Sequence, residues 1–302
     1  MNEEIKQFLT KFFASSELNR LHENYGGGRI FSDPLIGVAS GDDRIYQKFK
    51  EVVAPEHFTP LEFWLAEGLE SLPASNLRVL SIVFPFSDKI RKESKNSIES
   101  KRLKLPAEIY SLARNYANEF KQETCKQVIL FLEKKGYNGI AGLLSTNFTI
   151  ITKGKFYSNW SERHTAFAAG LGTFSLHEGL ITEVGCNIRL GSVVTNAPLK
   201  ITPRKSDDPY ANCLFYSKGT CKKCVENCPA GAISEKGHNK NVCYFYGRKI
   251  ERKMNLRIGS ILKSHHRYID GEWKEQAPPV GCAFCQFDVP CMDKNPMAST
   301  NK

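Results

Sequence analysis

The sequence lacks the features of an exported or membrane-spanning protein. No apolar run approaches the roughly 18 to 20 residues that a bilayer-spanning helix needs. The N-terminal stretch MNEEIKQFLTKFF has acidic residues where a secretory signal peptide has a basic head. Long internal repeats and low-complexity tracts are also missing, while 41% of the 302 residues are hydrophobic. These absences exclude a fibre or a disordered tail, and we expect a cytoplasmic protein with a large core and no membrane contact.

The basic excess is confined to the second half of the chain. Residues 1–150 contain 20 Lys and Arg against 19 Asp and Glu, and residues 151–302 contain 22 against 13. The halves therefore carry +1 and +9 of the total charge of +10. This balance suits an acidic partner, either a small acidic electron carrier or a nucleic acid, and it also offsets the negative charge of metal-thiolate clusters. The sequence has no Lys/Arg run with interleaved aromatic residues to mark such a partner's site.

Hydrophobic periodicity predicts a mixed α and β chain. The patterns indicate helices over 2–20, 61–69 and 106–135, and strands over 77–84, 139–144, 148–152 and 188–195. The polar segment 199–210 contains two prolines and is typical of a linker. We therefore expect a layered domain at 1–205 and a cysteine-rich domain at 206–302.

Cysteines are concentrated in the last third of the chain. Two of the ten, Cys125 and Cys186, lie outside this region and are predicted to be small buried hydrophobic residues. The other eight are Cys213, Cys221, Cys224, Cys228, Cys243, Cys282, Cys285 and Cys291. A disulfide framework is typical of secreted chains of less than about 100 residues, and zinc sites usually use two CxxC pairs. Both remain alternatives to an iron-sulfur site.

The spacing around Cys221 favours iron-sulfur clusters. Cys221-x2-Cys224-x3-Cys228-Pro229 places thiolates on one tight loop, and the cysteine before proline ordinarily ligates the other cluster of a pair. Read in the order of a bacterial two-cluster ferredoxin, the cysteines form two ligand sets. Cluster one takes Cys213, Cys221, Cys224 and Cys291, and cluster two takes Cys228, Cys243, Cys282 and Cys285. The eight-residue gap before Cys221 departs from the ferredoxin spacing, so a single cluster with unrelated thiols is a further alternative.

Two segments before the cysteines carry a family resemblance. Residues 161–172 read SERHTAFAAGLG and residues 191–196 read GSVVTN. With the cysteine block, they resemble the epoxyqueuosine reductase family and its reductive dehalogenase relatives over about residues 160–291. The resemblance implies an α+β fold in which a nitroreductase-like cobalamin-binding domain is fused to a bacterial ferredoxin-like 2[4Fe-4S] domain. It implies corrinoid contacts from Ser161, His164, Gly170, Gly172, Gly191 and Ser192. The cobalt-binding motif DxHxxG is absent, so we expect base-off cobalamin.

The sequence departs from the family pattern at three places. The family's GLGWxGKN continues here as Gly170-Leu171-Gly172-Thr173-Phe174-Ser175-Leu176-His177, which also fails the GxGxxG pattern for a nicotinamide cofactor. The stretch 155–160, KFYSNW, has no acid where epoxyqueuosine reductases carry a catalytic aspartate. The chain ends eleven residues after Cys291, without the helical-repeat tail of some tRNA-acting members. These departures argue against epoxyqueuosine in tRNA as the substrate.

The catalytic candidates follow from the dehalogenase resemblance. Reductive dehalogenases have a tyrosine proton donor, and Tyr157 lies close to the position of the missing aspartate. A phenol of pKa about 10 delivers its proton if a cation stabilises the phenolate, and Arg163 or Lys155 is the candidate cation. Glu162 is a further catalytic candidate. Tyr157 could instead be a packed aromatic residue, Glu162-Arg163 a structural ion pair, and His164 a satisfied buried histidine rather than a cobalt ligand.

The sequence thus predicts an iron-sulfur, cobalamin-dependent reductase. Single electrons would pass from an external ferredoxin- or flavodoxin-type donor through two [4Fe-4S] clusters to a corrinoid that reduces a small or planar substrate. The alternatives are an electron-transfer protein without corrinoid, an epoxyqueuosine (tRNA) reductase and, as a minor version, flavin in the nitroreductase-like domain.

Overall fold

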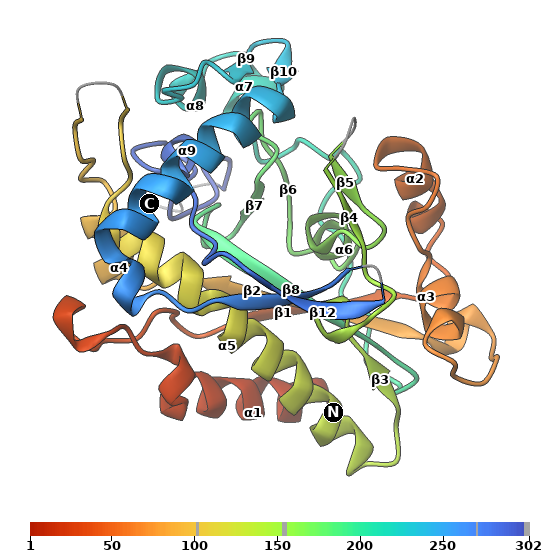
Figure 1. Cartoon of the computed structure of the whole chain (residues 1–302). Coiled ribbons are helices and arrows are strands. Elements are labelled where there is room, and N and C mark those ends of the chain that lie inside the picture. Colours follow the sequence, from red (N-terminus) through yellow and green to blue (C-terminus); the bar gives the residue numbers. More distant parts are fainter. Residues whose placement is uncertain (101–102, 153–155, 270, 299–302) are drawn as a thin grey trace.

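A computed structural model describes residues 1–100, 103–152, 156–269 and 271–298 (Figure 1). Its α-helices are α1 (Asn2–Ser15), α2 (Ile45–Val52), α3 (Pro60–Ala66), α4 (Asp88–Glu93), α5 (Glu108–Glu133), α6 (Glu162–Ala168), α7 (Leu214–Lys218), α8 (Lys223–Glu226) and α9 (Lys240–Ile258). Its strands are β1 (Leu35–Ser40), β2 (Arg78–Pro85), β3 (Gly139–Ile140), β4 (Ile150–Ile151), β5 (Tyr157–Ser158), β6 (Gly172–Phe174), β7 (Leu180–Thr182), β8 (Ile188–Thr195), β9 (Ile233–Ser234), β10 (Gly237–His238), β11 (His265–Ile269) and β12 (Glu272–Gln276). The fold is mixed α and β, as predicted.

A four-stranded antiparallel sheet with the order β1-β2-β8-β3 forms the centre of the molecule. β2 pairs with β8 over its whole length, and Ser81 lies opposite Ser192. β3 meets β8 only at Val194 and Thr195. Among the described residues, the earlier part of β8 therefore has no strand partner on that edge.

Hydrophobic side chains on both faces of the sheet form two clusters. Along β2, Leu80, Ile82 and Phe84 join one cluster with α1 and α5, whereas Val79 and Val83 join a second cluster with α2, α3 and α6. Successive strand residues point to opposite faces, so a strand buried on both faces has a continuous apolar sequence. Figure 1 shows α1 and α5 on one side of the sheet and α6 on the other.

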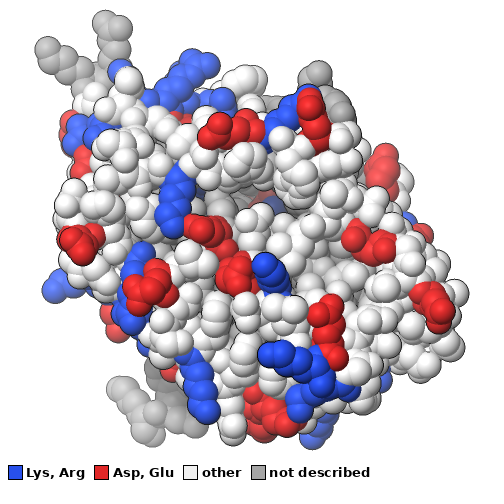
Figure 2. Space-filling view, turned by 60° about the horizontal axis from the view of Figure 1, so that its bottom comes forward, with Lys and Arg blue, Asp and Glu red and all other residues white. Residues whose placement is uncertain are grey.

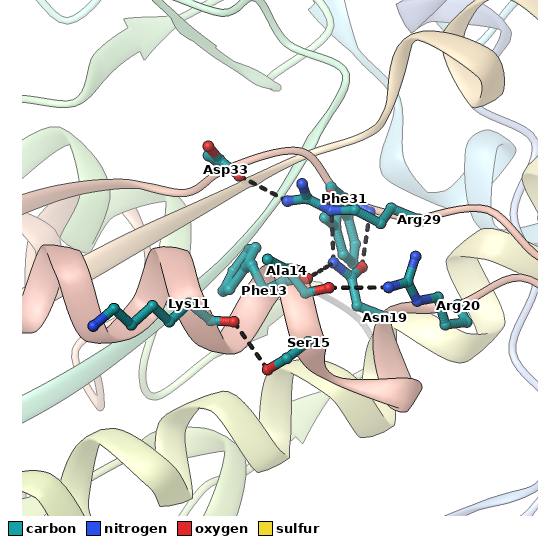
Figure 3. A network of polar contacts seen from close by, with 9 residues as sticks. All are labelled: Lys11, Phe13, Ala14, Ser15, Asn19, Arg20, Arg29, Phe31 and Asp33. Atoms are coloured by element: carbon teal, nitrogen blue, oxygen red, sulfur yellow. Dashed lines mark hydrogen bonds and ion pairs between the residues drawn. The ribbon is translucent and has the colours of Figure 1, made fainter.

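The fully buried Asn19 fixes the end of the first helix (Figure 3). Its Nδ2 donates to the carbonyl oxygens of Phe13 and Phe31 at 2.8 and 3.1 Å, and its Oδ1 accepts from Phe31 N at 2.8 Å. These bonds satisfy the buried amide and tie α1 to the segment before β1. The helix predicted over 2–20 therefore stops at Ser15, and a short 3-10 turn over Glu17–Asn19 follows.

Two strand predictions were too long. The segment 139–144 is a strand only at β3, because a 3-10 turn over Gly142–Leu144 follows it. The segment 148–152 contains only the exposed two-residue strand β4, which pairs with β5 rather than with the central sheet. Apolar runs of this length occur in strands and in other buried or half-buried segments, and periodicity does not separate them.

The cysteine-rich part packs against α5. Asn115 exchanges two 2.8 Å hydrogen bonds with the backbone of Lys263, and Tyr116 Oη donates to Ile261 O at 2.8 Å. One hydrophobic cluster contains residues of both parts, among them Val128 and Met254. The two-domain division at 205 stays a prediction.

The surface carries charges of both signs. Lys and Arg side chains are interspersed with Asp and Glu over the described part of the face in Figure 2, so the basic excess is not concentrated there. Across the same described residues, every helix is too short or too polar to traverse a lipid bilayer.

Candidate functional site

The eight clustered cysteines come from several short elements of the C-terminal part. All ten cysteines of the chain are free thiols, so the structure forms no disulfide framework from them. Cys213 is the N-cap of α7, Cys224 lies in α8, and Cys243 lies in the first turn of α9. The remaining five occupy loops or turns: Cys221, Cys228, Cys282, Cys285 and Cys291.

Four cysteines form a first set around α8. Burial raises the pKa of Cys224 to about 12, and the negative charges of Cys291, Cys213 and Cys221 raise it further. The three thiols whose charges raise the pKa of Cys224 are those predicted to share cluster one with it. Buried thiols with raised pKa values keep their protons unless a cation replaces them, as a metal does on binding.

A second set lies between α9 and the loop that precedes the C-terminus. Burial raises the pKa of Cys282 to about 12, and the charges of Cys243 and Cys228 act in the same direction. Burial also raises the pKa of Cys285 well above its usual value, and Cys282, Cys243, Cys224 and Cys228 add to this. Cys224 belongs to the first set, so the two sets adjoin.

The last ligand candidate lies against the N-terminal part. Cys186 N donates to Cys291 O at 2.8 Å, and Asn187 N donates to Met292 O at 3.1 Å. The Sγ atoms of Cys186 and Cys291 are 3.8 Å apart, and His177 Nε2 is 3.9 Å from Cys291 Sγ. Cys186 is buried, as predicted, but its contact with a candidate cluster ligand was not foreseen. The pairing joins segments about a hundred residues apart, so no local sequence signal could reveal it.

Ser161 and His164 belong to a compact polar network at the start of α6. Ser161 N donates to His57 Nε2 at 3.1 Å, and Ser161 Oγ lies 2.7 Å from His164 Nδ1. Burial lowers the pKa of His57 to about 4 and that of His164 to about 3. His164 also packs against the rings of Phe49 and Phe174. These contacts give both sequence candidates a role in holding α6.

Glu162 lies beside Ser192 of β8. Burial raises its pKa to about 7, and a hydrogen bond from Ser192 and the charge of Lys121 oppose this effect. Its Oε2 is buried and has no hydrogen-bond partner among the described residues. Ser192 Oγ also accepts from Trp160 Nε1 at 2.9 Å. The carboxyl group is therefore poised to hold or release a proton near neutral pH.

Two cations from α5 line the same region. Arg114 and Lys121 are seven residues apart and lie on one helix face. Neither forms an ion pair or hydrogen bond with the described residues, and both keep accessible side-chain surface. Burial nevertheless lowers the pKa of both groups, that of Lys121 to about 8. We call the region around Arg114, Lys121 and Glu162 the inner polar site. Sequence reasoning missed both cations, whose only signal is their spacing.

Arg163 does not pair with Glu162. Its Nη1 donates to Glu178 O at 2.6 Å, and the Glu178 carboxylate lies 3.4 Å from His238 Nδ1 and 3.5 Å from Lys240 Nζ. A hydrogen bond with Cys243, followed by one with Glu178, raises the pKa of His238 to about 9. Arg163 thus connects α6 to the second cysteine set.

Tyr157 is half-buried in β5, opposite Ile151 of β4. The neighbouring Phe156 ring packs 4.9 Å from the ring of Tyr244, which follows Cys243 on α9. Arg163 donates its hydrogen bond to Glu178 O, and none joins it to Tyr157 among the described residues. Lys155 lies outside the described residues. The proton-donor role of Tyr157 stays a prediction.

The predicted glycine contacts divide into two groups. A Cβ on Gly172 would collide with Ile181 O, and one on Gly170, whose φ is +74°, would lie 2.9 Å from Pro203 O. Both glycines also line a cleft of about 370 Å³ together with the start of α1, and none of the eight cysteines lies among its described lining residues. Gly191 is in the sheet interior, where a Cβ would lie 3.3 Å from Cys125 Sγ. Close packing explains all three positions.

Known proteins were compared with the chain at the level of sequence and of structure. No protein-family model matches the chain, and the comparison with curated proteins gives no match either. The solved structure of epoxyqueuosine reductase from Streptococcus thermophilus superposes on 98% of this chain and 69% of that chain, with a TM-score of 0.50 and 14% identity. The chain has the fold of epoxyqueuosine reductase. A selenomethionine-labelled epoxyqueuosine reductase gives a TM-score of 0.49 at 15% identity over the same shares. The catabolic reductive dehalogenase NpRdhA gives 0.47 at 12% identity over 86% of this chain and 30% of that chain.

Proposed function

We propose that the protein is an iron-sulfur oxidoreductase with two [4Fe-4S] clusters. The observation that carries this proposal is that the charges of Cys291, Cys213 and Cys221 act on Cys224, and those of Cys243 and Cys228 act on Cys282. This grouping supports the crossed order of a two-cluster ferredoxin. The donor chemistry fits, because Ala232 N also points at Cys228 Sγ at 3.3 Å, as backbone amides do at cluster sulfurs. Cluster one would be held by Cys213, Cys221, Cys224 and Cys291, and cluster two by Cys228, Cys243, Cys282 and Cys285.

An acidic carrier of ferredoxin or flavodoxin type would supply the electrons at α9. Phe245, Lys249, Arg252 and Leu256 follow one another at helical spacing, and all four are exposed. Neither Lys249 nor Arg252 forms an ion pair with a described residue. The helix also carries Cys243 of cluster two, so a carrier bound there would lie close to that cluster.

The docking of this carrier is tested by charge reversal. Lys249→Glu with Arg252→Glu should slow reduction by an acidic ferredoxin about tenfold or more at low salt, because electrostatic steering is lost. Reduction by dithionite should not change. Lys134→Glu, an exposed lysine beyond the end of α5, is the control. Equal rates with ferredoxin for wild type and the double variant would place the donor elsewhere.

We further propose that the inner polar site would hold a base-off corrinoid. The support is the shared fold together with polar groups that lack partners: the buried Glu162 Oε2 and the cations Arg114 and Lys121. The amide and phosphate groups of a corrinoid would satisfy donors and acceptors of this kind. When bound, a corrinoid supplies a strongly reducing cobalt centre. The 370 Å³ cleft beside α1 is near the lower limit for drug-sized ligands, so we assign the corrinoid to the inner polar site instead.

The chain's own residues would supply the proton for reduction. Glu162, with its pKa raised to about 7, can hold a proton near neutral pH and release it to a substrate, and Arg163 fixes α6 against the Glu178 loop. On a substrate found by screening small planar compounds, loss of the principal donor should lower turnover about 10² to 10⁴-fold. Comparing Glu162→Gln with Tyr157→Phe identifies that donor. The epoxyqueuosine reductase alternative predicts turnover of modified tRNA in the same assay.

Visible spectroscopy separates the reductase from an electron-transfer protein. After anaerobic reconstitution with iron, sulfide and hydroxocobalamin, the protein should retain corrinoid through desalting, and paramagnetic resonance of the Co(II) form should show no axial nitrogen splitting. Lys121→Gln should retain less, whereas Lys126→Gln, on the exposed side of α5, should match wild type. A protein that holds clusters but retains no corrinoid would favour the electron-transfer alternative. A flavin spectrum would favour the alternative in which the nitroreductase-like domain binds flavin.

A further inference from the structure

Three groups meet at the sulfur of Cys291. His177 Nε2, Cys186 Sγ and Cys291 Sγ all lie within 4.8 Å of one another. His177 and Cys186 are buried, at 5% and 2% exposure. Neither is one of the eight candidate cluster ligands, so their presence beside the sulfur needs a separate explanation.

The backbone fixes which nitrogen of His177 carries the proton. Gly179 N lies 3.2 Å from His177 Nδ1 and can only donate, so Nδ1 must accept. The neutral imidazole then carries its hydrogen on Nε2, the nitrogen 3.9 Å from Cys291 Sγ. The tight approach of Gly179, where a Cβ would lie 2.8 Å from His177 Nδ1, holds the ring in this orientation.

This tautomer makes His177 a donor rather than a metal ligand. The set of one nitrogen and two sulfurs would suit zinc. A metal-bound histidine, however, uses the lone pair of one nitrogen and donates the hydrogen of the other. Here the nitrogen facing the sulfurs holds the hydrogen, and the far nitrogen accepts from the backbone.

Cys186 is held beside the same sulfur by main-chain contacts. Its N–H donates to Cys291 O at 2.8 Å, and its thiol hydrogen is directed to Cys291 Sγ at 3.8 Å. Gly185 precedes it with φ of +83°, and a Cβ there would lie 2.6 Å from Asp293 N. A larger residue at 185 would push the C-terminal segment, and Cys291 with it, away from Cys186.

We propose that His177 and Cys186 donate hydrogen bonds to the Cys291 thiolate and thereby raise the reduction potential of cluster one. Hydrogen bonds to a ligating sulfur withdraw negative charge from it and favour the more negative, reduced cluster. This inference rests on the proposed function, because it requires Cys291 to ligate a cluster.

The test is an anaerobic redox titration of the reconstituted protein, followed by paramagnetic resonance. His177→Phe and Cys186→Ala should each shift one cluster midpoint to a more negative potential, leave the other in place and keep the wild-type iron content. His177→Gln, which restores an N–H donor, should recover part of the shift. Cys125→Ala is the matched control, because this buried thiol contacts Ser192 O instead of a candidate ligand and should move neither midpoint.

Unchanged midpoints in both variants at full iron content would overturn the inference, and loss of about half the iron would show that the altered residue is a ligand instead. If the variants fail to fold, nitrogen-15 resonance of labelled histidine in the wild type decides the point, since a proton on Nδ1 of His177 would contradict it. Failure of the proposed function appears separately, as a wild-type protein without two clusters.

Discussion

Trp160 Nε1 donates a 2.9 Å hydrogen bond to Ser192 Oγ in the interior of the protein. The bond joins the residue before the N-cap of α6 to the central strand β8. The Ser192 hydroxyl thus accepts a hydrogen bond from the Trp160 indole and interacts with the Glu162 carboxyl group. It therefore helps to position both side chains.

Removing this hydroxyl should destabilise the protein. Ser192→Ala leaves the buried indole N–H without an acceptor, which costs about 1 to 3 kcal/mol. We expect a lower melting temperature in anaerobic thermal unfolding, whereas Ser15→Ala, at an exposed site on α1, should melt close to wild type. Equal melting of the two variants would mean that the indole finds another acceptor.

His57 should make stability fall in mild acid. Its pKa is lowered to about 4 by burial, against 6.5 for the unfolded chain, so between these values the unfolded chain binds more protons. The free energy of unfolding is therefore highest above pH 6.5 and decreases as pH falls toward 4. His57→Phe should be less stable at pH 7.5, because Ser161 N loses its acceptor, and should show a shallower decline between pH 7.5 and 5. His266→Asn, at an exposed site on β11, is the control.

Glu162 should have the opposite pH effect. Its pKa is raised to about 7 against 4.5 for the unfolded chain, so the folded protein binds more protons in this window and stability falls as pH rises through it. Glu162→Gln removes the cost of burying an ionised carboxylate. The variant should therefore melt at a higher temperature than wild type at pH 8 but not at pH 4.5. A melting difference of the same size at both values would contradict the raised pKa. Glu133→Gln, which is exposed, should show no such crossover.

The two cysteine sets should be separable by single substitutions. Cys224→Ser should remove the signal of cluster one, and Cys285→Ser that of cluster two, each leaving about four iron atoms per chain. Cys125→Ser, in the core, should keep both signals. Loss of both clusters from each ligand variant would instead indicate that the sets assemble together.

The sequence was most informative where the pattern is local. The apolar run of β2, the long helix α5 and the crossed order of the cysteines follow from periodicity and spacing, and the structure bears out the first two. Three features of the three-dimensional arrangement could not be predicted: the pairing of Cys186 with Cys291, the approach of Lys121 to Glu162, and the tautomer of His177. The first depends on how the C-terminal part packs on the sheet, the second on how α5 and α6 pack, and the third on the backbone conformation at Gly179. Neither spacing nor composition encodes these arrangements.

The most direct test of the account is the iron and acid-labile sulfide content of the anaerobically purified protein. Two [4Fe-4S] clusters predict about eight of each per chain, with magnetic coupling between the reduced clusters because the ligand sets adjoin. About four of each, or stoichiometric zinc in their place, would contradict the two-cluster account.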